Sequence, residues 1–249
     1  MAHSFVLRDA ERGHQTLVST GPNASYVAGH PDGVITRHSS FNFHEYQSGR
    51  PGFGKIRVFG DEVFSGVGCG YNMHPHHNFL IMAFVLEGRL THINTMGKID
   101  ELEPGDYYLA SFGSGGKHCE LNLEAKDLNV IYVWALPDRL MLPPRYSRAH
   151  FDAAAARNRL VTLIGATPGA VPIPQDFRVS RLVGDRAQRH TYRPASRAHG
   201  VYIFVVAGEI GCAGMELGRR DSAGVWDVDE IICETGPGPS DVLFVETIM

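Results

Sequence analysis

Short apolar runs recur along most of the chain, and Gly, Asp or Pro bounds each of them. The runs are rich in Val, Ile, Phe and Tyr, as in "FLIMAFVLEGRLTHI", "GDYYLASFG" and "VYIFVVAGEIGCAG". Strand-forming residues at this spacing, separated by turn residues, predict an all-β sandwich or barrel. The exception is "RAHFDAAAARNRL", residues 148–160, whose alanines predict a short helix.

A proline-rich stretch, "PDRLMLPPRYS", divides the strand pattern into two parts. Prolines suit an extended connector, so we place a domain boundary here. The predicted division is an N-terminal domain over residues 1–137, a linker with the short helix over 138–158, and a C-terminal domain over 159–249.

The two parts also resemble each other. The segment "AFVLEGRLTHINTMG" (83–97) aligns with "IFVVAGEIGCAG" (203–214), and Gly88 and Gly208 correspond at an offset of 120 residues. This repeat of a strand, a glycine turn and a second strand predicts two copies of one β-barrel unit.

Composition and charge fit a globular protein with many turns. Of 249 residues, 43% are hydrophobic and 20% are charged, and there are 28 Gly and 14 Pro. The net charge of −4 offers no overall attraction to phosphate backbones, so we expect no nucleic-acid partner. The longest apolar stretch, residues 79–86, is much shorter than the ~20 residues that span a bilayer, so we expect no membrane residence.

The four cysteines form no CxxC pair, and the start "MAHSFVLRDAERGH" lacks the basic and apolar regions of a signal peptide. A reducing cytoplasm is therefore the expected compartment, and we expect a monomer or a homodimer. The six arginines between Arg178 and Arg197 are interpreted as a solvated strand face and loop.

Three histidines stand in four residues just before an apolar strand, in "GYNMHPHHNFLIMAFVLEG" (70–88). Side chains at i and i+2 of a strand point the same way, so His74 and His76 can offer two imidazoles to one point, while His77 points to the surface. The same spacing recurs in "GSGGKHCELN", where His118 and Glu120 flank Cys119. We expect Cys119 to face away from the site.

These residues predict a metal centre with ligands His74, His76, His118 and Glu120. Three neutral nitrogens and one carboxylate leave one or two positions open on a six-coordinate ion, which suits Fe(II), Ni, Co, Mn or Cu with exchangeable ligands. A structural zinc site is usually closed and often rich in thiolates, although Zn stays among the candidates. Glu120 is also the candidate catalytic residue, as a ligand that can accept a proton.

Most of residues 40–150 resembles a known family through specific motifs, and the second half of the chain resembles it only as a strand pattern. The pirin pattern "GxGxxMHPHxN…YVLEGxLxHxDSxG…PGD…GSGxxHSExN" corresponds to "GCGYNMHPHHNFLIMAFVLEGRLTHINTMGKIDELEPGDYYLASFGSGGKHCELN". The resemblance implies a bicupin, with two cupin (jelly-roll-like) β-barrel domains in one chain. It also implies that the four predicted ligands hold iron, Fe(II), or a related divalent metal in the N-terminal cupin.

Two departures from the pirin pattern affect the site. Leu80 replaces the glutamate that pirins carry four residues after the second histidine, so the fourth ligand is assigned to Glu120. Leu80, Ile81, Met82 and Phe84 form an apolar wall that suits either an aromatic substrate or ordinary core. Residues 15–39 do not follow the pattern and are candidates for remodelling the pocket mouth.

Two further positions are interpreted alongside the resemblance. His92, on the strand after Gly88, is expected to be a hydrogen-bonded structural residue rather than a fifth ligand. The repeat offset places Pro194 and Ser196 at the positions of the two histidines of the HxH motif, so the C-terminal cupin is predicted to be free of metal.

The resemblance implies a metal-dependent oxygenase of the quercetin 2,3-dioxygenase type, because bacterial and human pirins show that activity. Its partners would be dioxygen and a small aromatic or enolic substrate, such as a flavonol or catechol. One alternative is a non-catalytic, iron-dependent redox-sensing regulator of a partner protein, as the human member is a nuclear transcriptional co-regulator. Another is a biosynthetic metal-dependent tailoring enzyme. The sequence has no DNA-reading motif, which counts against the regulator.

Overall fold

The computed structural model describes residues 3–20, 27–28, 33–43 and 47–249. Strands form nearly all of the regular structure there, and a short 3-10 turn, η1 (Asp9–Glu11), is the helical element. None of the described residues form a helix long and apolar enough to cross a membrane. The chain divides into two compact units. The first domain holds the described residues of Gly13–Gly52 and Ile56–His150. The second domain holds the described residues before Gly13, together with Phe53–Lys55 and Phe151–Met249.

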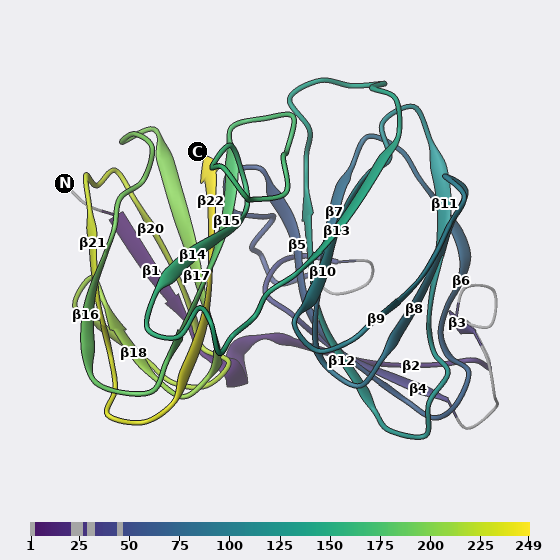
Figure 1. The fold of residues 1–249 in the computed structure, drawn as a ribbon, viewed down its shortest axis with the longest axis horizontal. Coiled ribbons are helices and arrows are strands. Elements are labelled where there is room, and N and C mark those ends of the chain that lie inside the picture. Colours follow the sequence, from purple (N-terminus) through teal and green to yellow (C-terminus); the bar gives the residue numbers. More distant parts are fainter. Residues whose placement is uncertain (1–2, 21–26, 29–32, 44–46) are drawn as a thin grey trace. The chain divides into compact units, whose positions relative to one another are not determined.

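The first domain is built from two antiparallel sheets (Figure 1). Its strands are β2 (Gly13–Val18), β3 (Val27–Ala28), β4 (Val34–Ser39), β5 (Ile56–Ser65), β6 (Cys69–His76), β7 (Leu80–Glu87), β8 (Leu90–Asn94), β9 (Lys98–Leu102), β10 (Asp106–Ser111), β11 (Gly116–Asn122), β12 (Leu128–Ala135) and β13 (Arg145–His150). The larger sheet has the order β13-β10-β7-β12-β5-β4-β2, and the smaller one has the order β3-β6-β11-β8-β9. One apolar core draws on both sheets. The sheets remain separate in their hydrogen bonding, so this domain is a two-sheet sandwich rather than a closed barrel.

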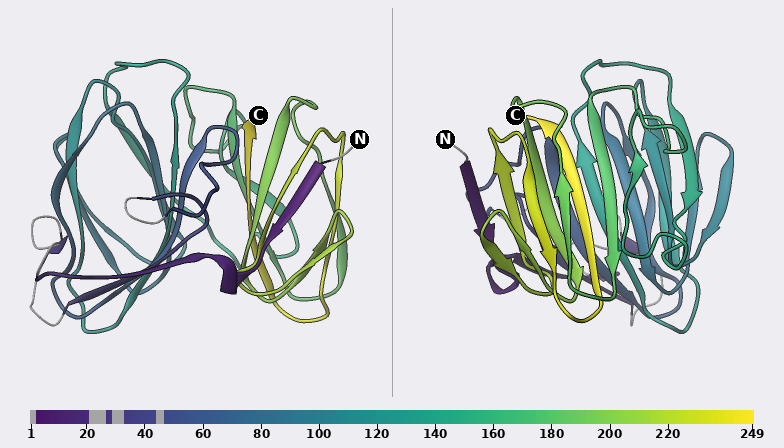
Figure 2. Two further views of the ribbon diagram at one scale, coloured as in Figure 1. Left: turned by 180° about the vertical axis from the view of Figure 1, so that it is seen from behind. Right: turned by 60° about the vertical axis from the view of Figure 1, so that its left-hand side comes forward.

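The second domain has the same architecture. Its strands are β1 (His3–Leu7), β14 (Leu160–Ile164), β15 (Phe177–Gly184), β16 (Gln188–Tyr192), β17 (His199–Ala207), β18 (Ile210–Cys212), β19 (Met215–Leu217), β20 (Ser222–Trp226), β21 (Ile231–Thr235) and β22 (Ser240–Ile248). They form sheets of order β1-β20-β17-β22-β15-β14 and β16-β21-β18-β19. The first strand of the chain, purple in Figure 2, pairs antiparallel with β20.

The predicted internal repeat is confirmed by the strand orders and by its glycines. The order β10-β7-β12-β5-β4 corresponds to β20-β17-β22-β15-β14, and β6-β11-β8-β9 corresponds to β16-β21-β18-β19. Gly88 and Gly208 have φ values of +74° and +73°. A Cβ at Gly88 would lie 2.5 Å from the carbonyl oxygen of Asp127, and one at Gly208 would lie 2.0 Å from that of Pro239. Both turns therefore require glycine.

The helix predicted over residues 148–160 is wrong. Strand β13 takes the first part of this segment and pairs with β10, and the rest forms turns. The N–H of Ala156 donates to the carbonyl of Asp152 at 2.9 Å, but the N–H of Asn158 donates to Val183 at 2.7 Å. An alanine run this short gains little from helix propensity, and pairing with neighbouring strands overrides it.

The observed division also differs from the predicted domain boundaries, and two of the differences concern whole strands. Strand β1 belongs to a sheet of the second domain, and β13 belongs to a sheet of the first domain rather than to a linker. Both segments complete a sheet edge, where their backbone groups find hydrogen-bond partners that a free connector would lack. Sequence proximity alone did not indicate either pairing.

Two features of the second domain were not predicted. Cys212 and Cys233 lie opposite each other on β18 and β21 and are joined by a disulfide. The interpretation of the arginine run as solvated is wrong for Arg181, which is buried and binds Asp241 through Nε at 2.8 Å and Nη2 at 2.6 Å. A carboxylate on the paired strand β22 makes this burial tolerable.

Candidate metal centre

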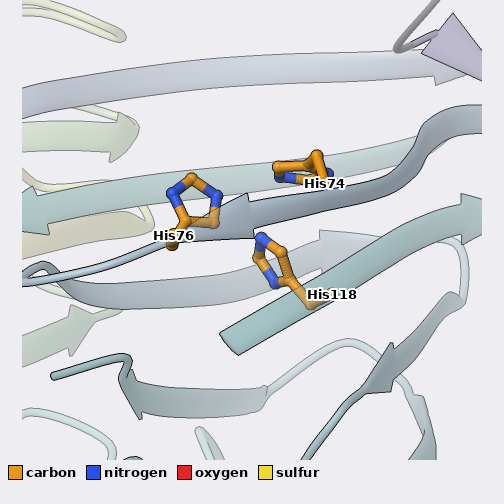
Figure 3. A group of neighbouring side chains, drawn as sticks. All are labelled: His74, His76 and His118. Carbon is orange, nitrogen blue, oxygen red and sulfur yellow. The ribbon is translucent and has the colours of Figure 1, made fainter. Parts of the chain in front are cut away.

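Three histidines from two neighbouring strands come together inside the first domain. His74 and His76 lie on β6 and His118 lies on β11, and His118 pairs directly with His74. Figure 3 shows the three rings gathered around one space. Their centroids are 4.5 to 4.9 Å apart, and one nitrogen of each ring lies within 4.8 Å of the others. The structure thus brings together the three predicted imidazoles.

A β-bulge shapes β6 at this point. On β11, His118 and Glu120 are two residues apart, but their partners on β6, His74 and Tyr71, are three residues apart. The extra residue turns Tyr71 to the same side as His74, where strict alternation would place it on the opposite face. The adjacent Gly70 lets the backbone of β6 approach β11 closely, because a Cβ at this position would lie 2.0 Å from the carbonyl oxygen of Glu120.

The ring nitrogens are arranged as metal ligands require. His74 Nδ1 lies 2.7 Å from the carbonyl oxygen of Asn72, and donation to that oxygen leaves a lone pair on Nε2. The Nε2 atoms of His76 and His118 are buried and have no hydrogen-bond partner among the described residues. Because buried polar atoms nearly always have a partner, these nitrogens fit a bound cation.

The surroundings keep the three imidazoles neutral. Burial lowers the pKa of His74. Burial and the neighbouring His74 lower the pKa of His76 to about 3. Burial and the nearby histidines hold the pKa of His118 well below its ordinary value. Neutral imidazole is the form that coordinates a metal, so the lone pairs are available at neutral pH.

Glu120 is buried on β11 beside His118. Its Oε2 lies 3.7 Å from His118 Nε2, and its Oε1 accepts a short hydrogen bond from Tyr108. Its carboxylate groups with His92 and His118, not with all three histidines of the cluster. Burial raises the pKa of Glu120 to about 8, with the charge of Glu62 adding to it and the Tyr108 hydrogen bond opposing it. A divalent cation would favour the ionised carboxylate.

His77 and Cys119 are placed as the sequence predicted, whereas the role of His92 stays a prediction, because His92 also belongs to a candidate ligand group with His118 and Glu120. His92 is fully buried and hydrogen-bonded, with Nε2 3.1 Å from His118 Nδ1. His77 is exposed, and Cys119 is buried outside both ligand groups.

A cavity of about 270 Å³ lies beside His74 and Glu120. Its other described lining residues combine aromatic walls with a few polar groups, and they are Arg37, Phe43, Glu62, Tyr71, Pro75, Tyr132 and Trp134. The indole Nε1 of Trp134 is buried without a hydrogen-bond partner among the described residues. Leu80, Ile81, Met82 and Phe84 are buried but are not among these lining residues, so the aromatic wall comes from other strands.

A buried polar cluster that sequence reasoning missed forms one side of the cavity. Arg37 Nε donates to Glu62 Oε1 at 2.9 Å, and Tyr71 donates to Glu62 Oε2 at 2.7 Å. Arg37 also donates a short hydrogen bond to the Tyr71 hydroxyl. Burial disfavours the charged guanidinium, but Glu62 and Tyr71 outweigh burial and raise the pKa of Arg37.

The sequence contained a partial signal for this cluster. Alternation along "VITRHS" places Arg37 on the same face as the buried Ile35. Arg37 belongs to the atypical segment 15–39, so this segment contributes to the cavity wall. Within that segment, residues 21–26 and 29–32 lie outside the described residues.

Two jelly-roll-like domains, one of which encloses a histidine cluster, define the architecture of a bicupin. Comparisons with known proteins agree with this class. The pirin family model matches residues 24–135, and the model of the quercetinase C-terminal cupin domain matches residues 165–247.

Relatives cover nearly the whole chain. A protein of Pseudomonas aeruginosa, provisionally named a quercetin 2,3-dioxygenase, is 30% identical over 218 residues, which is 86% of this chain and 93% of that protein. The quercetin 2,3-dioxygenase of Escherichia coli is 29% identical over 216 residues, covering 85% and 91% of the two chains. The bacterial pirin YhhW of E. coli, solved in complex with nickel(II), has a TM-score of 0.85 at 24% identity, with 99% of each chain covered. The chain belongs to the pirin family.

Proposed function

We propose that this protein is a metal-dependent dioxygenase that cleaves a planar aromatic or enolic substrate, of the flavonol or catechol class, beside the histidine cluster of the first domain. The observation that carries the proposal is that the buried Nε2 atoms of His76 and His118 have no hydrogen-bond partners among the described residues and lie next to a cavity with aromatic walls. The quercetin 2,3-dioxygenase name of the E. coli relative supports this choice of substrate class.

The residues present fit one divalent ion. His74, His76 and His118 would each supply a nitrogen, and Glu120 would supply a carboxylate oxygen from the same strand as His118. Fe(II) and nickel are the favoured candidates, and the nickel complex of YhhW shows that a bacterial pirin binds the latter. When bound, the ion offers open positions that activate a substrate hydroxyl and dioxygen toward each other.

The chain's own residues would bind and orient the substrate. Phe43, Tyr71 and Trp134 offer ring faces and edges that match a planar aromatic ligand and exclude water from it. The Trp134 indole N–H, which lacks a protein acceptor among the described residues, would donate to a carbonyl or hydroxyl oxygen of the substrate. This contact would fix which edge of the ring approaches the histidines.

Glu120 would accept the hydroxyl proton of the substrate. It is a carboxylate that both lines the cavity and lies next to a histidine of the cluster. Tyr108 holds one of its oxygens through a hydrogen bond, which restricts the orientation of the carboxylate. Proximity of the acceptor to the substrate hydroxyl is the contribution that the chain itself makes to this step.

An oxygen electrode tests the proposal. Tag-free protein loaded with Fe(II) or with Ni(II) is mixed with quercetin, simple catechols and enols, and the expected result is consumption of one O₂ per substrate cleaved. Metal-free protein and a His118→Ala variant serve as controls, and both should be inactive. Protein that binds the ion but consumes no oxygen with any of these substrates would contradict the dioxygenase and favour a non-catalytic regulator.

A further inference from the structure

His92, which is not one of the four proposed ligands, contacts the side chain of the candidate ligand His118. It lies on β8, directly opposite Glu120 on β11, and it is completely buried. Its Nε2 is 3.1 Å from Nδ1 of His118. In a contact between two neutral imidazoles, one nitrogen must carry the hydrogen and the other must accept it.

The metal role proposed for His118 determines the direction of this hydrogen bond. If Nε2 of His118 gives its lone pair to a cation, Nδ1 carries the hydrogen and donates to Nε2 of His92. The hydrogen of His92 then resides on Nδ1, which is buried without a hydrogen-bond partner among the described residues. The neighbouring strand β9 carries Asp100 directly opposite His92. The Oδ1 of Asp100 lies 3.4 Å from Arg148 Nη1, and its Oδ2 is buried without a described hydrogen-bond partner. The carboxylate of Asp100, on the strand next to His92, favours the tautomer with hydrogen on Nδ1 of His92.

Aromatic packing fixes the ring of His92 in place. Tyr146 stacks on it with centroids 5.0 Å apart and an angle of 8° between the planes. Tyr108, which also holds Glu120, packs against His92 at 4.5 Å. His74, by contrast, has its Nδ1 bonded to a backbone carbonyl, which can only accept. His118 is therefore oriented by a rigid side chain, whereas His74 is oriented by a main-chain carbonyl.

We infer that His92 is a positioning residue: it sets the tautomer and the ring orientation of His118, and through them the affinity of the first domain for its metal. This inference rests on the proposed metal role of His118 but not on the identity of the substrate. A partner that orients a metal-ligating histidine typically contributes 10- to 100-fold to metal affinity.

Two variants of His92 test this role. His92→Phe keeps a ring between Tyr108 and Tyr146 but removes the acceptor, and His92→Gln offers an amide oxygen as a replacement. The affinity for Ni(II), measured by competition with a chelator, should fall about 10- to 100-fold in His92→Phe and by less in His92→Gln. His199→Phe, which changes a buried histidine of the second domain, is the matched control and should leave the affinity unchanged.

Nitrogen-15 NMR of wild-type protein loaded with diamagnetic Zn(II) tests the tautomer without any substitution. The expected spectrum has hydrogen on Nδ1 of His118 and none on Nε2 of His92. A zinc-bound nitrogen on His92, or a Ni(II) affinity of His92→Phe within twofold of wild type, would overturn the inference. Metal binding with the predicted tautomer but without oxygen uptake would support the role of His92 while contradicting the dioxygenase. Wild-type protein that binds no metal would overturn both.

Discussion

The two domains share one strand order but enclose different interiors. In the first domain, Trp134 on β12 pairs with Val58 on β5, and the interior around Trp134 contains the histidine cluster and the cavity. In the second domain, Glu246 on β22 pairs with Arg178 on β15, which is 120 residues after Val58. A charged pair thus occupies the register that an indole and an aliphatic side chain occupy in the first domain.

The polar groups of the second interior bond to one another. Tyr192 donates to Glu246 Oε2 at 2.8 Å, Arg178 Nε donates to the Tyr192 hydroxyl at 3.1 Å, and the Ala195 N–H donates to Glu246 Oε1 at 2.7 Å. Both groups of side chains that could hold a metal, among the residues described, lie in the first domain. That the second domain binds no metal stays a prediction.

The comparison shows which buried polar groups point to function. Each domain contains a buried cluster of arginine, glutamate and tyrosine, so such a cluster does not by itself identify a binding site. The first domain differs because nitrogens of His76, His118 and Trp134 lack described hydrogen-bond partners beside a cavity that His74 and Trp134 line. Single buried atoms without described hydrogen-bond partners, such as His190 Nε2, also occur in the second domain, so the distinguishing feature is the gathering of several imidazoles into one group.

The largest expected effect is the loss of a ligand in the first domain. His118→Ala should weaken Ni(II) or Fe(II) binding by more than about 100-fold, because it removes a proposed ligand rather than a supporting group. The matched change in the second domain, His190→Ala, should leave the metal content unchanged. Metal analysis of both purified variants checks this prediction. An equal loss of bound metal in the two variants would contradict the claim that only the first domain holds the metal centre.

An intermediate effect is expected when each ion pair is broken. Glu246→Gln should lower the free energy of unfolding by about 2 to 4 kcal/mol, because it leaves Arg178 without its buried counter-charge, although Arg178 keeps some contact with solvent. Its metal affinity should equal that of wild type. Glu62→Gln should lower stability by a similar amount and also reduce turnover, because Glu62 lines the cavity.

Urea denaturation, metal titration and oxygen uptake of these two glutamate variants distinguish the roles. A change in metal affinity caused by Glu246→Gln alone would show that the second domain contributes to the centre.

The smallest expected effect concerns the indole of Trp134. Trp134→Phe keeps an aromatic wall but removes the N–H donor, so KM for a flavonol should rise about 3- to 10-fold, the range expected for one hydrogen bond. The metal content should not change. Initial rates of oxygen uptake give the answer, and a fall in kcat at constant KM would contradict a role in substrate binding.

Local spacing predicted the central part of the site. The alternation of His74 with His76 and of His118 with Glu120 is contained in two short motifs, so strand geometry alone placed these side chains on common faces. Tyr71 escaped prediction because the bulge in β6 changes the alternation just before His74, and nothing in the spacing signals the bulge.

Pairing between distant segments could not be predicted in the same way. Arg37 and Glu62 meet because β4 and β5 are neighbours, with Arg37 directly opposite Glu62, and this register is a tertiary property. The pairing of β1 with a strand more than 200 residues away is likewise a tertiary property. So is the pairing of β13 with β10, which makes the start of the predicted helix a strand despite the helix propensity of the alanines that follow. The repeat was predictable because its glycines are required by backbone geometry.

Anomalous X-ray scattering at the nickel edge, from crystals of tag-free protein loaded with Ni(II), tests the central claim most directly. The predicted result is one ion per chain in the first domain, within about 2.3 Å of a nitrogen of His74, of His76 and of His118. An ion bound elsewhere, or no ion at these imidazoles under saturating nickel, would contradict the claim that the first domain is built to hold a metal.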